Sequence, residues 1–165
     1  ARTSPSPLSH LLLPQPKLKK KAEINDYVRC ISIPKENESV RVGDLCTVSG
    51  WGRTSLDPPE MRGSDVLMEV DLEVQYAEIC EQRFRNYQCQ SMICVGDENR
   101  KKSTYKGDSG GPLVCNKKAH GIVSRGKSGH LFPKVFTRIS HFEPWIRKKL
   151  QGFSRKAIPC IPFSE

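Results

Sequence analysis

Residues 107–115 read GDSGGPLVC, with three glycines around one serine and a short apolar run behind them. An apolar run of this kind after a glycine-rich turn is typical of a β-strand. The hydroxyl of a serine such as Ser109 is a poor nucleophile unless a base removes its proton and donors stabilise the developing oxyanion. Glycines favour the second requirement, because they allow neighbouring backbone N–H groups to converge on one point. The stretch therefore suggests a nucleophilic serine, with an ordinary hairpin turn as the alternative.

Short β-type runs, separated by Gly, Pro and Asp, fill most of the chain from Val40 onward. Apolar residues alternate with polar ones between Val66 and Tyr76, which is the pattern of a half-buried strand. Many short strands with turn residues between them predict an all-β fold that closes into a barrel. The other strands are expected over residues 44–49, 112–115, 120–124 and 135–139.

Two helices are also expected, a short one over residues 77–84 and a longer, closing one over residues 141–150. Ser140 and Glu143 have the Ser-x-x-Glu spacing of a capping box at the start of the longer helix. Pro144 would then lie in its first turn, where a missing N–H costs little.

The composition indicates one ordinary hydrophobic core, since the chain has 165 residues of which 36% are hydrophobic. Seven cysteines in a chain of this size favour an oxidising compartment. The triplet Asn37-Glu38-Ser39 is an N-glycosylation acceptor and makes Asn37 a candidate site. No stretch is long and apolar enough to span a membrane, and the run Leu11–Leu13 is too short for a signal-peptide core.

The net charge is +9, with basic clusters at residues 19–21, 100–102 and 147–149. Such a balance is either a solvated basic surface or an attraction to polyanions, such as heparin-like sulfated glycans or nucleic acid. None of the clusters lies in an aromatic-rich nucleic-acid motif, so nucleic acid is the least favoured of these partners.

The complete string around Ser109 resembles the trypsin/chymotrypsin-like serine peptidases. Further matches come in the order of that family, and three longer segments are most similar to the granule proteases cathepsin G, the granzymes and the mast-cell chymases. The resemblance implies a trypsin-like β-barrel fold, mainly the second barrel with the linker and the closing helix, the first barrel being largely missing. The matching strings are GWGRT at 50–54, ICVGD at 93–97, HGIVSRG at 120–126, VFTRIS at 135–140 and PWI at 144–146. The three segments are NDYVRCISIP at 25–34, LCTVSGWGRTS at 45–55 and AHGIVSRGKSG at 119–129.

The resemblance gives a role to each residue around the serine and implies neither a cofactor nor a metal ion. Ser109 would be the nucleophile, and Gly107 and Ser109 would supply the oxyanion-hole N–H groups. Asp108 would be the acid that pairs with the new amino terminus when a zymogen is cleaved. The substrate pocket would be formed by Ser103 at its floor, Ser124, Arg125 and Gly126 along the substrate strand, and Lys134.

Lys134 stands where many relatives have a glycine. A lysine that projects into the pocket would favour acidic residues just before the scissile bond, as in the granzymes that cleave after aspartate. The alternative is that Lys134 points aside and has no role in specificity.

Two disulfides are implied by the same resemblance, Cys46 with Cys115 and Cys80 with Cys94. Cys30, Cys89 and Cys160 remain. A bridge between Cys30 and Cys160 is conceivable, but the sequence does not determine it.

A serine triad also needs a histidine base and a buried acid that orients it. The family carries these in an A-A-H-C string and an N-D-I-x-L-L string, and neither occurs among the 165 residues. The four histidines, His10, His120, His130 and His141, all have ordinary explanations. The chain is therefore expected to be a catalytically incomplete relative of the serine endopeptidases, and its status as an enzyme stays open.

The expected organisation is an irregular segment of unassigned origin over residues 1–16, a partial peptidase domain over residues 17–152 and a tail over residues 153–165. By resemblance the protein would be secreted or stored in granules of leukocytes or mast cells, with peptide or protein substrates if a complete form exists. The alternative function is a non-enzymatic cationic pseudoprotease that binds polyanions or microbial surfaces. A third reading is a splice form or partial gene model without a stable product.

Overall fold

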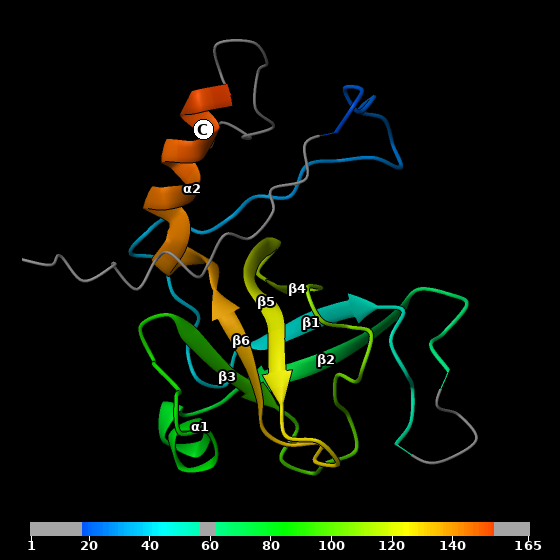
Figure 1. The fold of residues 1–165 in the computed structure, drawn as a ribbon, viewed down its shortest axis with the longest axis vertical. Helices are drawn as coiled ribbons and strands as arrows, with labels where there is room; N and C mark the ends of the chain where they lie inside the picture. Colours follow the sequence, from blue (N-terminus) through cyan, green and yellow to red (C-terminus); the bar gives the residue numbers. More distant parts are fainter. Residues whose placement is uncertain (1–17, 57–61, 154–165) are drawn as a thin grey trace, which may run out of the picture. The chain divides into compact units, whose positions relative to one another are not determined.

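The computed structural model describes residues 18–56 and 62–153 (Figure 1). It divides into two compact units, one that ends at Cys30 and one that begins at Ile31. In the first unit the side chain of Asn25 accepts hydrogen bonds from the backbone N–H groups of Tyr27 and Val28, at 2.8 and 3.0 Å. This closes a turn, and residues 18–30 contain neither a helix nor a strand.

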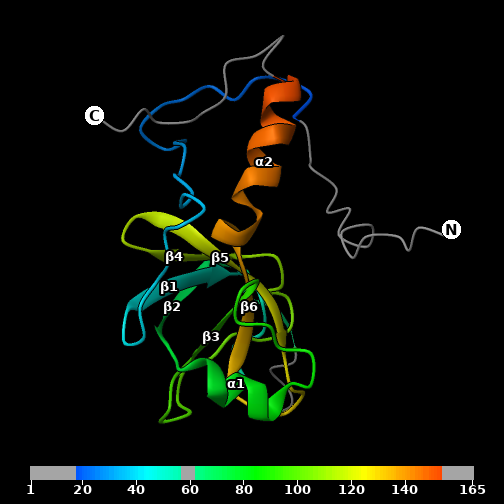
Figure 2. The same cartoon turned by 90° about the vertical axis from the view of Figure 1, so that its left-hand side faces the viewer.

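The second unit is built around a closed antiparallel barrel in which the strands follow the order β1-β2-β3-β6-β5-β4 (Figures 1 and 2). The all-β prediction with a barrel and a closing helix is therefore confirmed. The strand at residues 92–96 was not expected from the sequence. The strands are β1 Leu45–Gly50, β2 Met68–Val74, β3 Met92–Gly96, β4 Pro112–Cys115, β5 Lys118–Gly126 and β6 Lys134–Arg138.

Apolar and polar residues alternate along the strands, and the apolar ones form the core. In β2, Leu72 and Val74 are buried, while Glu69, Asp71 and Glu73 face solvent. Burying a large aliphatic side chain stabilises the fold by roughly 1.5–3 kcal/mol. The main core consists of Cys46, Val48, Leu72, Val74, Ile93, Val95, Leu113, Cys115, Val123 and Phe136.

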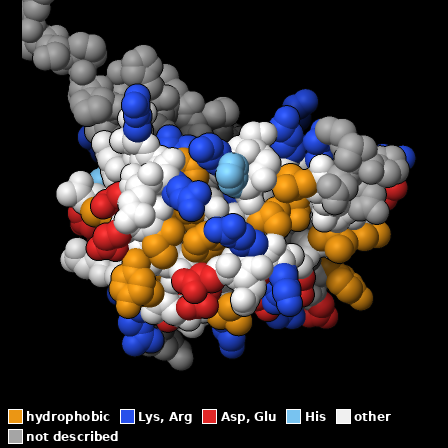
Figure 3. Space-filling model, turned by 90° about the horizontal axis from the view of Figure 1, so that it is seen from below, with side chains coloured by type: hydrophobic (Ala, Val, Ile, Leu, Met, Phe, Trp, Pro, Cys, Tyr) orange, Lys and Arg blue, Asp and Glu red, His pale blue; other side chains and the backbone are white. Residues whose placement is uncertain are grey.

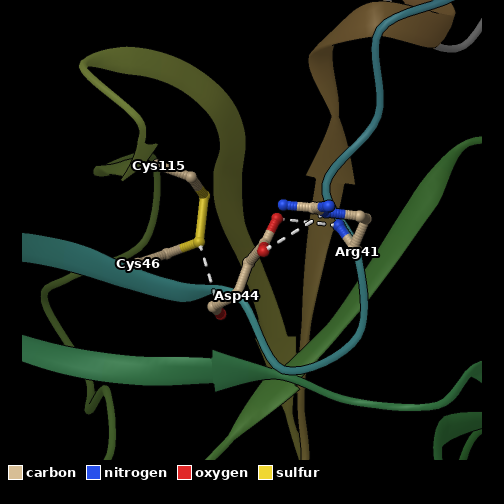
Figure 4. A network of polar contacts seen from close by, with 4 residues as sticks. All are labelled: Arg41, Asp44, Cys46 and Cys115. Atoms are coloured by element: carbon tan, nitrogen blue, oxygen red, sulfur yellow. Dashed lines mark hydrogen bonds and ion pairs between the residues drawn. A yellow bond between two sulfur atoms is a disulfide. The ribbon is translucent and has the colours of Figure 1, made fainter.

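The barrel closes where β1 pairs with β4, through Thr47 opposite Val114 and Val48 opposite Leu113. One position further along, Cys46 and Cys115 form a disulfide with their Cα atoms 4.5 Å apart. Figure 4 shows this bridge beside the turn that leads into β1.

In that turn the carboxylate of Asp44 accepts a hydrogen bond from the backbone N–H of Arg41 at 2.9 Å. The Arg41 guanidinium lies 3.8 Å from the same carboxylate, as Figure 4 shows. The turn thus fixes the direction in which the chain enters β1.

The second disulfide that the resemblance implied, Cys80–Cys94, is also formed and ties helix α1 (Ala77–Arg83) to β3. Its two sulfurs are buried against Val135 of β6 in a small core of their own. Cys30 is disulfide-bonded as well, and Cys89 is an exposed free thiol. Cys160, the conceivable partner of Cys30, lies outside the described residues.

The closing helix, α2 (Ile139–Phe153), starts two residues earlier than the sequence suggested. Because β6 ends at Arg138 and the helix begins at Ile139, Ser140 is a buried helical residue and not an N-cap. Glu143 forms an ion pair with Arg147 one turn later. The capping-box prediction is therefore wrong, and Pro144 lies inside the helix, where it leaves the carbonyl of Ser140 without its helical donor. Neither helix of the described residues has the length and apolar character needed to cross a membrane.

Candidate active site and substrate cleft

Ser109 lies in an exposed turn that leads into β4. The turn is fixed to β5 by two backbone hydrogen bonds of 2.9 Å, from the N–H of Gly110 to the carbonyl of Val123 and from the N–H of Val123 to the carbonyl of Gly111. Gly107 and Gly110 have φ of +107° and +87°, values that favour glycine. A Cβ on Gly107 would also lie 2.7 Å from the Cα of Gly52. The glycines are thus required for the turn that exposes the serine hydroxyl.

Asp108 points the other way, into the body of the domain. Its two carboxylate oxygens accept hydrogen bonds of 2.8 Å, one from the backbone N–H of Gly52 and one from that of Tyr105. A Cβ at Gly50 or Gly52 would overlap with this carboxylate. Within the described residues Asp108 forms no ion pair. In the described part of the chain, the donors to this half-buried carboxylate are neutral backbone N–H groups.

A hollow of about 200 Å³ opens beside Asp108. The strand ends Val48–Gly50 and Met68–Val70 form one wall, and the segment Lys101–Tyr105 forms another. Cationic and anionic groups both reach it, since Arg53, Lys101, Lys102 and Glu69 are among the lining residues. The sequence did not reveal that the GWG motif of residues 50–52 cradles Asp108. In the sequence, the only indication of this contact with Asp108 was the spacing of the two glycines, Gly50 and Gly52.

The sequence assigned three segments to a substrate pocket, and they lie close to one another. They are the segment of Ser103, residues 124–126, and the segment of residues 131–134 that contains Lys134. The hydroxyl of the buried Ser103 donates a hydrogen bond of 2.6 Å to the carbonyl of Leu131, which joins the first segment to the third. Gly126 of β5 pairs with Lys134 of β6. The Lys134 side chain lies directly against Gly126, because a Cβ on that glycine would be 2.5 Å from Cδ and 2.8 Å from Nζ.

Lys134 is a half-buried cation. Burial lowers the pKa of its ammonium group from the ordinary value, and the negative charge of Asp108 partly opposes that shift by raising it. No carboxylate of the described residues lies within ion-pair distance of Lys134. The side chain thus lies along Gly126 of β5, and its role in specificity stays a prediction.

The end of β5 has one open edge. β4 pairs with β5 only up to Pro112 opposite Ile122, while β6 continues beside β5 to Gly126. Among the residues that the structure describes, a strand therefore lies on only one side of residues 124–126, next to the turn that carries Ser109. The register shifts between Val123 and Arg125, so that Ser124 bulges and is exposed.

No described histidine forms a hydrogen bond with Ser109. His120 is buried in β5, and burial lowers the pKa of its imidazole, while the nearby Glu38 carboxylate partly opposes the shift. His130 and His141 are exposed, and His10 lies outside the described residues. No group of His, Cys, Asp and Glu side chains in the described part of the chain is arranged to hold a metal ion.

Asn37, the glycosylation candidate, is exposed in a turn closed by a hydrogen bond of 3.0 Å from the N–H of Glu38 to the carbonyl of Lys35. The carboxylate of Glu38 lies 2.7 Å from the ammonium of Lys118 on β5. This ion pair and the hydrogen bond it includes hold the pKa of Glu38 below its usual value. The acceptor side chain is thus presented to solvent by a turn that is anchored to the barrel.

The trypsin family model matches residues 15–146. The chain belongs to the trypsin family. Within that family it is similar to granule proteases: it is 48% identical to human cathepsin G over 136 residues, which cover 82% of this chain and 52% of that protein. It is 46% identical to bovine duodenase-1, with 85% of this chain and 55% of that protein covered. For mouse granzyme B(G,H) the identity is 44%, and the coverage is 82% and 54%.

Solved structures agree with this assignment. The structure described as "Structure of GrC" has a TM-score of 0.75 and 40% identity, and it covers 82% of this chain and 59% of that chain. The mouse serine protease neuropsin has a TM-score of 0.73 and 31% identity, with 81% and 59% covered. The chain spans about half the length of the curated relatives it matches. The trypsin-family fold of this chain is thus shown over the part of those proteins that it matches.

Proposed function

We propose that this chain is the nucleophile-bearing and peptide-binding part of a granule-type serine endopeptidase, and that residues 1–165 alone bind peptides without cleaving them. The observation that carries the proposal is that the Ser109 turn is hydrogen-bonded to β5 just before residues 124–126, and that the half-buried Lys134 lies against Gly126 of that segment. An extended peptide can add to an open strand edge through main-chain hydrogen bonds, with pockets for alternate side chains.

In this proposal Ser109 attacks the peptide carbonyl, and the N–H groups of Gly107 and Ser109 stabilise the oxyanion. The left-handed conformation of Gly107 supports this role, since it turns the backbone so that two N–H groups can face one point. Ser103 forms the floor of the pocket. Asp108 awaits a cationic group such as a peptide amino terminus, which its half-buried and unpaired carboxylate beside a hollow supports.

Lys134 selects an acidic side chain at the anchor position, the peptide residue just before the bond that Ser109 would attack. A carboxylate that reaches Lys134 would replace the hydration that burial removes, and it would form a charge-assisted hydrogen bond. Such bonds contribute roughly 1.5–3 kcal/mol, which corresponds to tenfold or more in affinity.

Binding of fluorescent peptides measured by anisotropy tests this selection. A peptide with Asp at the anchor should bind about tenfold more tightly than its Asn counterpart. Lys134→Gln should abolish the difference, whereas Lys127→Gln, which removes an exposed cation from the neighbouring loop, should preserve it. Equal affinities for the Asp and Asn peptides would refute the role of Lys134.

Catalytic incompleteness is tested separately with a fluorophosphonate probe, which labels a serine only when a base activates it. No labelling of Ser109 is expected, and Ser109→Ala is the control for background. Labelling that disappears in Ser109→Ala would show that the chain contains a working base.

Polyanion binding is the second candidate function, and the loop at residues 97–102 favours it. The Asp97 carboxylate accepts hydrogen bonds from the backbone N–H groups of Lys101, Lys102 and Asn99, which hold the pKa of this carboxyl below its usual value. The basic side chains of residues 100–102 are all exposed, and none of them forms an ion pair with another described residue. Figure 3, a view from below, shows Lys and Arg side chains spread across that face of the molecule among hydrophobic ones. The loop thus holds three exposed basic side chains on a hydrogen-bonded turn, next to the acidic Asp97 and Glu98, and exposed basic clusters attract sulfated glycans.

The cluster on α2 provides a matched control. There Arg147 is paired with Glu143, and the ammonium of Lys149 lies 6.0 Å from the centre of the Trp145 ring. Replacing residues 100–102 by serine should lower the salt concentration of elution from heparin more than replacing residues 147–149 by serine, although each change removes three charges. Equal shifts would indicate an unspecific effect of net charge. We also propose a secreted or granule location of leukocyte or mast-cell type, which the names of the relatives support.

A further inference from the structure

Tyr27 differs from the other three tyrosines of the chain in its exposure. It is 97% exposed and Tyr76 is 63% exposed, whereas Tyr87 and Tyr105 are partly buried. A tyrosine ring stabilises a fold mainly through the area that it buries. Tyr27 contributes almost no such burial, and its phenol hydroxyl is accessible to other molecules.

A hydrogen-bonded turn over residues 25–28 holds Tyr27 in this position. The side-chain oxygen of Asn25 accepts from the N–H groups of Tyr27 and Val28 at 2.8 and 3.0 Å, and the N–H of Asn25 donates to the carbonyl of Val28 at 3.1 Å. Asparagine favours such turns because its side chain bonds to the backbone two residues later. Asp26 and Tyr27 form the tip, and the side chain of Asp26 is 92% exposed. The turn thus presents a carboxylate and a phenol from successive residues to solvent.

The charges closest to Tyr27 in the sequence are mostly acidic. Asp26 stands directly before it and Glu23 four positions before it, and both are exposed. The nearest cation in the sequence is Arg29, whose guanidinium lies 3.5 Å from the Asp26 carboxylate. Both side chains of this pair are largely exposed, so water screens their attraction. Asp26 can therefore exchange Arg29 for a cationic group of another protein.

The cysteines indicate the compartment in which the Tyr27 hydroxyl would meet a modifying enzyme. Five of the six cysteines in the described part of the chain are disulfide-bonded. Disulfides persist in the oxidising compartments of the secretory route and are rare in the cytosol. Phosphate transfer to tyrosine is chiefly a reaction of the cytosol, whereas sulfate transfer to tyrosine belongs to the secretory route. The bridged cysteines thus favour sulfate over phosphate as the group that Tyr27 accepts.

We propose that Tyr27 is a site of tyrosine O-sulfation. Its phenol oxygen attacks the sulfur of an activated sulfate donor, a mixed anhydride of sulfuric and phosphoric acid. A bond forms between that oxygen and the sulfur while the bond from the sulfur to the bridging oxygen breaks. The phosphate part leaves with the electron pair, and the phenol proton passes to a base of the sulfotransferase. Because the donor is an anion, the site of the transferase is cationic, and the carboxylates of Asp26 and Glu23 favour binding there.

Sulfation would change the charge of the segment around Tyr27. A sulfate ester is ionised throughout the physiological pH range and adds one negative charge, as other charge-changing modifications do. Residues 18–30 contain four basic and two acidic side chains. The modified chain should therefore elute from heparin at a lower salt concentration than the unmodified chain.

The experiment produces the full chain in an animal-cell host with a cleavable secretion leader and recovers it from the medium. After removal of any N-linked glycan, the intact mass should exceed that of the unmodified chain by one sulfate group. Fragmentation of the unaltered chain should place this added mass on Tyr27, so the test does not depend on the folding of a variant. The added mass should be lost in warm acid, which hydrolyses a sulfate ester, and should resist phosphatase. Absence of the added mass, its location on another residue or its removal by phosphatase would each overturn the proposal.

Variants then test how the site is recognised. Tyr27→Phe removes one hydroxyl and should abolish the modification, while Tyr76→Phe should retain it. Asp26→Asn should lower the modified fraction several-fold. Asp65→Asn is the matched control, because Asp65 is also an exposed carboxylate paired with an arginine three residues away, and it should leave the fraction unchanged. An unchanged fraction in Asp26→Asn would contradict recognition through the acidic side chain. None of these measurements depends on Ser109 or on peptide binding, so their outcome is separate from that of the proposed function.

Discussion

The backbone N–H of Gly52 donates a hydrogen bond of 2.8 Å to Oδ1 of Asp108, across 56 residues of sequence. Gly52→Ala would place a Cβ against the carboxylate and 2.8 Å from the Asp108 nitrogen. Overpacking of this kind costs typically 1–3 kcal/mol, and we expect a loss of stability in that range, measured as the free energy of unfolding in urea.

A double-mutant cycle with Asp108→Ala isolates the contact. Removing the carboxylate relieves part of the overlap, so Gly52→Ala should cost less in the Asp108→Ala background than in the native chain. Strictly additive costs would show that the two residues do not depend on each other.

His120 should make the fold less stable in mild acid. Burial lowers the pKa of its imidazole in the folded state, so the unfolded chain binds more protons once the pH falls below about 6.5. The stability is complete above that pH and declines as the pH falls through the lower pKa of the folded state. Glu38 also has a lowered pKa, but its contribution is lost only below its ordinary value of 4.5.

Urea unfolding at about pH 7.5 and about pH 5 measures this decline, since only a histidine has an ordinary pKa in that window. His120→Gln should flatten the dependence, while His130→Gln, at an exposed position, should leave it as in the native chain. A native-like decline in His120→Gln would assign the effect to other groups.

The two disulfides of the barrel should differ in their contribution to stability. The Cys46–Cys115 bridge joins residues 69 apart, whereas Cys80–Cys94 joins residues 14 apart. On the chain-entropy model, replacing both cysteines of the longer loop by alanine costs about 4 kcal/mol, and the shorter loop costs about 3 kcal/mol. Calorimetry or urea unfolding of the two double variants gives the order, and the reverse order would mean that local packing dominates.

Asn37 should carry an N-linked glycan when the chain is produced in a secretory host. The side chain is exposed in a turn, and Ser39 of the acceptor triplet is exposed as well. Treatment with a glycosidase specific for N-linked glycans should lower the apparent mass, and neither Asn37→Gln nor Ser39→Ala should show that change. An unchanged mass of the native chain after treatment would exclude modification at this site.

Local patterns located most of the barrel, since alternation between Val66 and Tyr76 reports directly which side chains face the core. They missed β3, because Met92–Gly96 is a short run buried along nearly its whole length and lacks alternation. The local patterns also placed the start of α2 two residues too late. The Ser140–Glu143 spacing imitates a capping box. The helix begins at Ile139, directly after β6 ends at Arg138, because tertiary packing decides this boundary.

By itself the sequence determined the family and predicted Ser109 as the nucleophile, because the glycines around Ser109 are needed by the backbone at that turn and are readable as a string. It also implied the two disulfides of the barrel through the same resemblance. Only the tertiary structure decided that Gly50 and Gly52 cradle Asp108 and that Lys134 lies against Gly126. These relations join residues far apart in the chain, and their physical basis is close packing and burial, which no local pattern of residues encodes.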